Sequence, residues 1–444
     1  MRLLIACDDS GSIKELICNK NTNTSVQTAP QPFHLGAHLP EGFGSRVEIM
    51  KMIGPQHLLV ARANGSIQLI ELKRVDRDVS VKDPAKEPIF QVSEMHAAST
   101  ISGLFDEARL LSIHKSSKKR SRPRDGFVAL ELVPQTSDRV FSATKSGLVH
   151  VLSIENGELK LISSNSVKAP LEFAQVYDLV AAQKTRQKKR ASAKLTFAYG
   201  GEENLVKIAQ FTSSYKTIEQ IWEAKNVSND RLDLKVPVWP MKLKFLEPAS
   251  AAVDEGKVNY QFVTINRLGL FREYRTLTGR KPMLSKALLP KNEFATQLQV
   301  INSDVTPAGN IRSNSFENLQ FVTSDLKKNV FSFNAASGSL GKYGNGDITG
   351  HASFLNIEKK YLLQGGLDRY VRVFDAESRA VICKCYTGSK ISSVVLVDEE
   401  EIDVPQLNEN KKRRPKHKDD KAEAEDDEKL WSTLESSAKK LKKS

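Results

Sequence analysis

Cysteine is the residue type whose spacing in this chain comes nearest to that of a chemical site. Cys383 and Cys385 are two residues apart, so on a strand both thiols would lie on one face, as metal ligands can. No further histidine or cysteine lies around them at the spacing of a zinc site. Cys7 and Cys18 also lie in apolar, strand-like contexts, where cysteine usually packs as a small hydrophobic residue. We therefore expect four core thiols, and neither a bound metal nor a cofactor.

Three other patterns point away from catalysis. The glycine-rich segment 344–350, GNGDITG, lacks the Lys-Ser/Thr pair of a phosphate-binding loop and is expected to be a turn. His150 lies within an alternating strand pattern, GLVHVLSI, which favours a packed side chain over a general base. The carboxylates of 397–403, VDEEEID, are an alternative cation site, but a flexible, solvated run of like charge is the more typical interpretation. The sequence therefore predicts a non-enzymatic protein.

The elements that carry these residues follow one repeated pattern, an apolar strand, a polar turn and an alternating strand. In GGLDRYVRVF, for example, Val371 and Val373 alternate with Arg372, which predicts one buried and one exposed face. The turns supply Gly, Asn or Asp, which tolerate a positive φ angle. Each copy therefore predicts a β-hairpin. The copies are residues 3–16, 58–72, 140–154, 195–211, 262–274, 321–333 and 362–374.

Seven such hairpins predict an all-β fold, a seven-bladed WD-type β-propeller over residues 1–398. A lone hairpin is barely stable, and the intervals leave room for two more strands per repeat. The first hairpin begins at the chain's start, whereas one unpaired strand, 390–397, follows the seventh. We expect this strand to complete the first blade from its inner edge, which would remove an exposed edge. A β-sandwich with coincidental hairpins is the alternative.

The positive charge of the chain is concentrated in two short segments. The net charge is +13, and segments 115–124 and 184–194 each hold six basic residues and no acidic one. They attract RNA phosphates or acidic partners, but contain no aromatic residue for base stacking. Solvated loops or secondary import signals are the alternative. The residues are Lys115, Lys118, Lys119, Arg120, Arg122, Arg124, Lys184, Arg186, Lys188, Lys189, Arg190 and Lys194.

Residues 399–444 are expected to form a charged, mostly disordered C-terminal tail. KKRRPKHK at 411–418 matches a nuclear-localisation cluster, with a solvated charge run as the alternative. Beyond it, a stripe at helical spacing either docks on a partner or stays mostly disordered. The localisation residues are Lys411, Lys412, Arg413, Arg414, Lys416 and Lys418, and the stripe comprises Leu430, Trp431, Leu434 and Leu441.

No apolar run approaches the roughly 18 residues that a membrane helix needs. The five-residue apolar stretch near the start is too short for a signal-peptide core. We therefore expect an intracellular protein without a membrane partner.

The last repeat resembles a WD repeat, with Gly350–His351, a turn Asp368 and Phe374–Asp375 in place of Trp–Asp. Gln364 lies near the usual Ser/Thr position and Phe374 replaces Trp, so the full hydrogen-bonded set of that repeat cannot form. The other six repeats match the signature less well.

Residues 1–34, the repeat pattern and the Lys-rich tail resemble a family of nucleolar WD-repeat proteins, the WD repeat-containing protein 74 and fungal Nop-seven-associated protein 1 family. These are assembly factors of the large ribosomal subunit. The resemblance implies a scaffold in nucleus and nucleolus that binds early pre-60S particles and other assembly factors, possesses no catalytic residues, and is removed by an AAA-type ATPase. We expect a monomer within that larger complex. A propeller adaptor of another nuclear complex, such as a ubiquitin ligase or chromatin complex, and a propeller hydrolase are the alternatives.

Overall fold

A computed structural model describes most of the propeller region. The described residues are 1–77, 88–114, 123–179, 194–212, 214–229, 231–248, 258–290, 293–301 and 304–403. One compact unit comprises Met1–Asp78 and Phe90–Ile402, and everything below concerns that unit. The predicted tail residues 411–418 and 430–441 lie outside the described residues.

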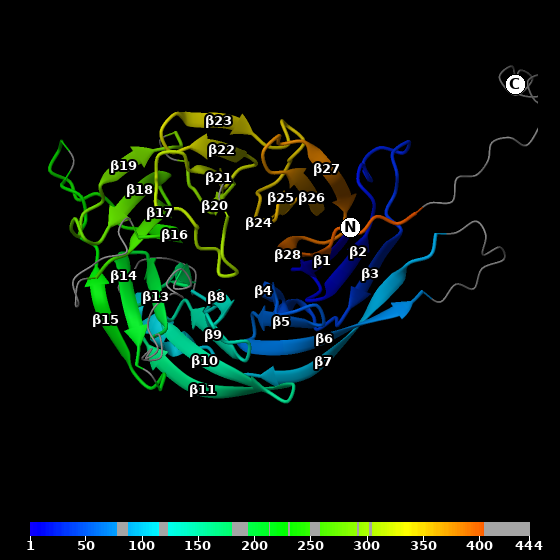
Figure 1. Ribbon diagram of the computed structural model, residues 1–444, viewed down its shortest axis with the longest axis horizontal. Coiled ribbons are helices and arrows are strands. Elements are labelled where there is room, and N and C mark those ends of the chain that lie inside the picture. The colour runs from blue at the N-terminus through cyan, green and yellow to red at the C-terminus, as the bar shows by residue number, and fades with distance from the viewer. Residues whose placement is uncertain are drawn as a thin grey trace, which may run out of the picture. The chain divides into compact units, whose positions relative to one another are not determined.

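Seven four-stranded antiparallel sheets form a ring, as Figure 1 shows. From inner to outer strand, blade 1 contains β28 (Ile391–Asp398), β1 (Arg2–Cys7), β2 (Ile13–Ile17) and β3 (His34–His38), blade 2 contains β4 (Val47–Met52), β5 (His57–Arg62), β6 (Ser66–Asp76) and β7 (Gln91–Ile101), and blade 3 contains β8 (Phe127–Leu132), β9 (Arg139–Thr144), β10 (Leu148–Glu155) and β11 (Glu158–Ser166).

The remaining four blades follow in chain order. Blade 4 contains β12 (Phe173–Val176), β13 (Thr196–Gly201), β14 (Asn204–Phe211) and β15 (Ile218–Glu223), blade 5 contains β16 (Pro240–Leu246), β17 (Gln261–Asn266), β18 (Leu270–Arg275) and β19 (Leu284–Ala287), blade 6 contains β20 (Gln299–Val300), β21 (Gln320–Ser324), β22 (Val330–Asn334) and β23 (Gly338–Lys342), and blade 7 contains β24 (Phe354–Glu358), β25 (Tyr361–Gly365), β26 (Tyr370–Asp375) and β27 (Val381–Tyr386). The short helices η1 (Phe43–Ser45) and α1 (Glu107–His114) lie on connections between blades. No described helix has the length and apolar character that would let it cross a membrane.

Each of the seven predicted hairpins is the middle strand pair of one blade, which confirms the propeller. The prediction of one exposed face per hairpin is wrong. Arg372, which alternates with valines on β26, is only 1% exposed, and Gln68 on β6 is 6% exposed. Neighbouring blades pack face to face around the ring, so both faces of a middle strand are covered.

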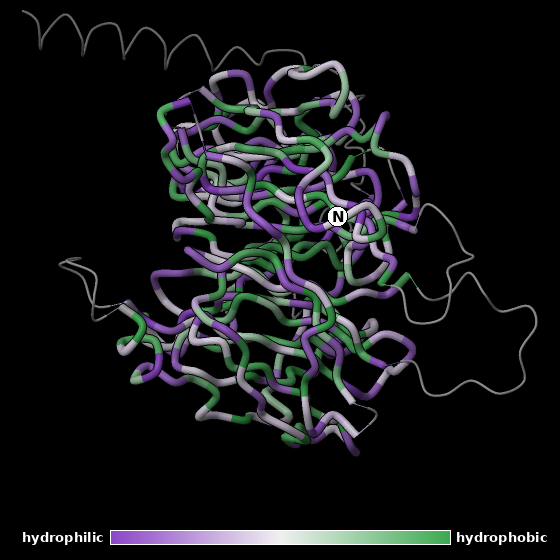
Figure 2. Tube along the Cα trace, turned by 90° about the vertical axis from the view of Figure 1, so that its left-hand side faces the viewer, coloured by the Kyte–Doolittle hydropathy of each residue, from purple (hydrophilic) through white to green (hydrophobic). Residues whose placement is uncertain are grey.

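The core is divided among the interfaces between blades. The buried apolar residues of the described chain form seven clusters, and each cluster joins two neighbouring blades. Figure 2 shows these hydrophobic stretches running through the body of the ring, with hydrophilic positions more frequent at its turns. Because every blade depends on two neighbours, the interface between first and last blades is needed as much as any other.

The ring closes as the sequence predicts. β28 pairs with β1 in antiparallel register, with Leu4 opposite Val395 and Ile5 opposite Val394. A second connection lies at the outer edge, where residues 21–24 run along β27 of blade 7. There Asn21 N donates to Ile382 O at 2.7 Å. Blade 1 is therefore completed by the chain's end, and its own loop extends blade 7.

The run 397–403 has exposed acidic side chains, as expected, but its backbone contacts the ring, and the compact unit extends past 398 to Ile402. The side chain of Glu400 is 80% exposed, but its carbonyl accepts a hydrogen bond from the Met1 amino group. Glu401 pairs with Lys20 at 2.9 Å, and Ile402 N donates to Asn19 Oδ1 at 2.8 Å. Opposite charges on the ring and these backbone hydrogen bonds offset the repulsion among the carboxylates of the run.

An arginine-centred network replaces the WD set in blade 7. Arg372 donates to Gln364 Oε1 at 3.0 Å and pairs with Asp368 at 2.9 Å and with Asp347 at 2.9 Å. Asp347 belongs to the glycine-rich turn 344–350, and its carboxylate is already paired with Arg372. Arg372 is thus well satisfied, whereas the Gln364 amide nitrogen is buried without a hydrogen-bond partner.

Candidate functional site: the channel and the face that carries its plug

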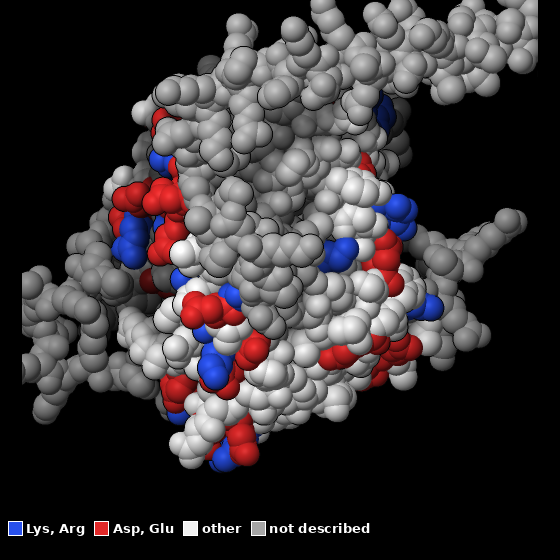
Figure 3. Space-filling view, turned by 90° about the vertical axis from the view of Figure 1, so that its right-hand side faces the viewer, with Lys and Arg blue, Asp and Glu red and all other residues white. Residues whose placement is uncertain are grey.

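A channel of about 780 Å³ runs along the ring axis and is lined by the inner strands of all seven blades. Both acidic and basic side chains line it, and most belong to inner strands or to residues next to them. The acidic side chains are Glu48, Glu131, Glu172 and Glu358, and the basic ones are Lys51, Lys145, Lys242, Lys244 and Lys359. On the outside, Figure 3 likewise shows acidic and basic side chains mixed on one side of the ring.

Burial makes two of these channel groups easier to neutralise. It raises the pKa of Glu358 to about 7, against the opposing hydrogen bonds from Leu396 N and Asn356 Nδ2, each 3.0 Å long. It lowers the pKa of Lys244 to about 8, although the negative charge of Glu131 opposes the shift. Both shifts disfavour the charged form, as desolvation does.

A loop from blade 6, residues 304–312, enters this channel, and we call it the plug. It follows β20, and in Figure 1 the chain between β20 and β21 reaches toward the centre of the ring. Lys51 Nζ of blade 2 donates to Pro307 O at 2.7 Å. Gln175 of blade 4 donates to Ala308 O at 2.5 Å. The plug therefore bridges three blades that are far apart in sequence.

Residues just beyond β12 hold the plug on its other side. Asp178 accepts hydrogen bonds from Thr306 Oγ1 and, at 3.1 Å, from Ala308 N. Asn310 Nδ2 donates to Val176 O at 2.8 Å. Gly309 has a φ of 77°, and a Cβ there would lie 2.8 Å from the Lys244 ammonium nitrogen. The positive φ favours glycine here, whereas the flexible end of Lys244 could move away from an added Cβ.

The plug defines one face of the ring, which we call the plug face. On this face the inner strand of each blade connects to the second strand, and the third strand connects to the fourth. The plug face therefore also carries residues 177–179, the 18–33 loop and residues 399–402. The opposite face carries the connections between blades, such as 39–46, and the turns of the seven predicted hairpins, such as 145–147. The strand order alone fixes this division, since the four strands of every blade alternate in direction.

The two basic segments begin on opposite faces. Arg124 is exposed just before inner strand β8, on the opposite face, whereas Lys194 is exposed just before β13, on the plug face. The structure therefore does not bring the roots of these segments together. Their other predicted residues, within 115–122 and 184–190, lie outside the described residues.

His150 is a packed residue, as expected. It is 2% exposed, its Nε2 lies 3.0 Å from Leu104 O, and burial lowers its pKa. None of the described residues that line the channel is a histidine. A propeller hydrolase would need histidine and carboxylates converging there, so no observation on the channel favours that alternative.

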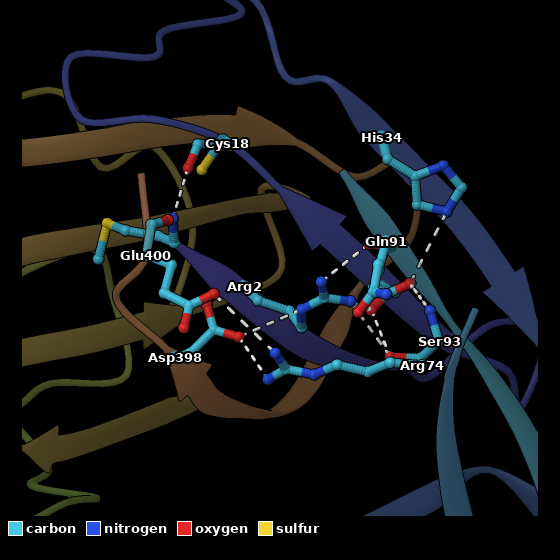
Figure 4. A network of polar contacts seen from close by, with 10 residues as sticks. Arg2, Cys18, His34, Arg74, Gln91, Ser93, Asp398 and Glu400 are labelled. Atoms are coloured by element: carbon cyan, nitrogen blue, oxygen red, sulfur yellow. Dashed lines mark hydrogen bonds and ion pairs between the residues drawn. The ribbon is translucent and has the colours of Figure 1, made fainter. Parts of the chain in front are cut away.

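A buried polar network joins strands of blade 1, including the closing strand β28, to blade 2 (Figure 4). Arg2 is 6% exposed and donates to Glu15, which is fully buried, at 2.5 Å. The same guanidinium donates to Gln91 O at 2.8 Å and lies 3.3 Å from Asp398 of β28. Ser93 N donates to the second Glu15 oxygen at 2.8 Å. One arginine thus joins the first strand, the last strand and blade 2.

Full-length relatives decide the family. "Ribosome biogenesis protein NSA1" of Eremothecium gossypii is 44% identical over 445 residues, which cover 100% of this chain and 98% of the relative. Its namesake in Saccharomyces cerevisiae is 42% identical over 457 residues, covering 98% and 97%. The chain belongs to the NSA1 family of ribosome biogenesis proteins. A more distant member, from Yarrowia lipolytica, is 24% identical and covers 100% of this chain.

No protein-family model matches the chain. Among solved structures, Sqt1 of Saccharomyces cerevisiae aligns with a TM-score of 0.46 and 11% identity, covering 86% of this chain and 82% of Sqt1. The Cps50 (Swd1) β-propeller domain of Myceliophteria thermophila aligns with a TM-score of 0.45 and 10% identity, covering 78% and 87%. These similarities are weak, and the seven sheets themselves establish the propeller of this NSA1 family member.

Proposed function

We propose that this NSA1 family member is a non-enzymatic assembly factor of the large ribosomal subunit that binds early pre-60S particles in the nucleolus. The observation that carries the proposal is the 40–44% identity to ribosome biogenesis proteins along the whole chain. Propellers present rigid loops at fixed positions, which suits a platform for several partners.

The plug face is the main binding surface in this proposal. It gathers the plug, the 18–33 loop and the last described residues of the chain at 399–402. The opposite face carries the hairpin turns and the connections between blades, of which the one that contains α1 and the one at 224–239 are long. Long loops held by a rigid ring are the usual site of partner recognition.

The basic segments, one on the plug face and one on the opposite face, add contacts to pre-ribosomal RNA through its phosphates. Without aromatic residues they cannot stack on bases, so the contact is independent of sequence. Since the segments begin on opposite faces, each contacts a different part of the particle. The alternative is that these segments are solvated loops or import signals, and the experiment below distinguishes the two.

The experiment on RNA uses one variant for each segment, with its six basic residues replaced by Gln. Engaging six charges gives a log–log salt slope of roughly −4 to −5. Each variant is expected to bind pre-ribosomal RNA more weakly and with a flatter slope than wild type. Binding curves identical to wild type for both variants would assign these segments to another role.

Sedimentation tests the proposed function as a whole. The tagged full-length protein is expected to co-sediment with pre-60S particles in gradients of nuclear extract. Co-sedimentation with a ubiquitin ligase or chromatin complex instead would contradict the proposal and favour the adaptor alternative. The proposal includes a monomer within the particle and, as the family resemblance implies, its release by an AAA-type ATPase. After depletion of that ATPase, the same gradients should show the protein persisting on later particles.

Nuclear localisation is proposed to depend on the tail cluster 411–418. Fused to a cytoplasmic reporter, this cluster should carry the reporter into the nucleus. A reporter that stays in the cytoplasm would leave the cluster as a solvated charge run. If the Trp431 stripe docks on a partner, Trp431→Ala should weaken that one interaction.

A further inference from the structure

Three of the four cysteines meet at the closure between blades 7 and 1. Cys383 and Cys385 alternate on β27, and Cys18 directly follows β2. The three sulfur atoms lie within 4.8 Å of one another, and those of Cys18 and Cys383 are 3.8 Å apart. The sequence pattern around Cys383 and Cys385 does not reveal this group, because Cys18 is 365 residues away from Cys383.

Backbone hydrogen bonds hold Cys18 against the two cysteines of β27. Lys384 N, between the two β27 cysteines, donates to Thr22 O at 2.9 Å, and Thr24 N donates to Lys384 O at 3.0 Å. Cys18 N donates to Met1 O at 3.0 Å. The chain on both sides of Cys18 is thus held on strands of the two blades, which pre-organises the three sulfurs before any ligand binds.

The surroundings suit a thiophilic ion. Cys18 and Cys385 are fully buried and Cys383 is 1% exposed, inside the apolar cluster that joins blades 7 and 1. Soft thiolates select Zn²⁺ and Cu⁺ over hard cations.

We propose that Cys18, Cys383 and Cys385 bind one thiophilic d¹⁰ metal ion, Zn²⁺ or Cu⁺, and that this ion cross-links the two ends of the ring. With metal–sulfur bonds of about 2.3 Å, tetrahedral ligation places sulfurs about 3.8 Å apart. The Cys18–Cys383 separation of 3.8 Å already has that value. The thiols release their protons on binding. Cu⁺ is satisfied by three sulfurs, whereas Zn²⁺ needs a fourth ligand.

A second group of ligating side chains in blade 1 is excluded by its own contacts. Glu15, His34 and His38 also lie within 4.8 Å of one another. Glu15 is already paired with Arg2, and both its oxygens accept hydrogen bonds from Ser93. A cation there would have to displace a buried guanidinium, whereas no ion pair of the described residues involves one of the three thiols.

The test uses the reduced, metal-free, full-length protein. Co²⁺, as a spectroscopic substitute for Zn²⁺, and Cu⁺ under anaerobic conditions with a competing chelator are each titrated into it. One ion per chain is expected for at least one metal, with a sulfur-to-metal charge-transfer band and a melting temperature that rises with free ion. Cys18→Ala should weaken binding by more than the roughly 10–100-fold typical of outer-shell changes.

Cys7 provides the matched control. It is also a fully buried free thiol of blade 1, but it lies outside the group, so Cys7→Ala should retain wild-type metal binding. Equal effects of the two substitutions would overturn the proposal, as would a wild-type protein that binds neither ion.

Native mass spectrometry of the wild type keeps the test decisive if Cys18→Ala fails to fold. The expected mass is that of the chain plus one ion, less the displaced protons. A mass that shows only the loss of two hydrogens, without metal, would mean a disulfide between two of these cysteines and would also overturn the proposal.

Discussion

The closure of the ring and the plug are both polar junctions between distant parts of the chain, but they differ in burial. At the closure, Glu15 is fully buried and Arg2 is 6% exposed. At the plug, the Lys51 side chain is 28% exposed and contacts Glu131 and Pro307 O, and the half-buried Asp178 contacts Thr306 and Ala308. Buried charge pairs are costly to break, whereas contacts in water are cheap to exchange. We therefore assign stability to the closure and recognition to the plug face.

Truncation after residue 388 should have the largest effect, because it removes β28. The inner edge of β1 then loses its partner, and the apolar cluster between blades 7 and 1 loses Val394 and Leu396. We expect the cooperative thermal transition, followed by circular dichroism, to disappear. Truncation after Asp403 is the control and should keep the wild-type transition. An unchanged transition after the first truncation would refute the closure.

Glu15→Ala should be the most damaging single substitution at the closure. It leaves the buried Arg2 guanidinium with the more distant carboxylate of Asp398, 3.3 Å away, and removing one partner of a buried ion pair typically costs about 3–5 kcal/mol of unfolding free energy. The control is Glu401→Ala, because the Lys20–Glu401 pair is 47% exposed on both sides and should be worth less than about 1 kcal/mol. Denaturant unfolding measures both. Equal losses would remove the contrast between buried and exposed pairs.

Glu358 gives the closure a pH dependence of defined sign. The pKa is about 7 in the fold and about 4.5 for a free side chain, so between these values the folded state binds more protons. Unfolding free energy contributed by this group is therefore present at low pH and lost as pH rises toward 7. Glu358→Gln should remove that loss. The unfolding free energy of the variant should then exceed that of the wild type by roughly 1–3 kcal/mol between pH 5 and pH 8. Parallel pH profiles would contradict this.

Asp178→Asn should have the smallest effect on stability. It weakens two hydrogen bonds of the plug, at a cost of about 1–2 kcal/mol. Association with pre-60S particles should nevertheless fall, because the plug is no longer held in place. If this variant unfolds as readily as Glu15→Ala, or if particle association is unaffected, the division between the two junctions is wrong.

The repeats were predictable from sequence because each hairpin is a local pattern. The strand at 390–397 could be placed for the same reason, since it was the one strand left without a partner. Arg372 could not be placed, because its burial depends on the blade packed against it rather than on its own strand. The plug and the Cys18 contact were missed since each joins residues hundreds of positions apart, and no local signal marks such pairs.

Hydrogen exchange of the free and the particle-bound protein tests the central claim most directly, because it reports on both junctions at once. We predict that the amides of β28 and β1 exchange slowly in both states, and that the plug and the 18–33 loop gain protection only on the particle. Protection gained instead on the opposite face, at 39–46 and 145–147, with fast exchange in β28, would contradict the account.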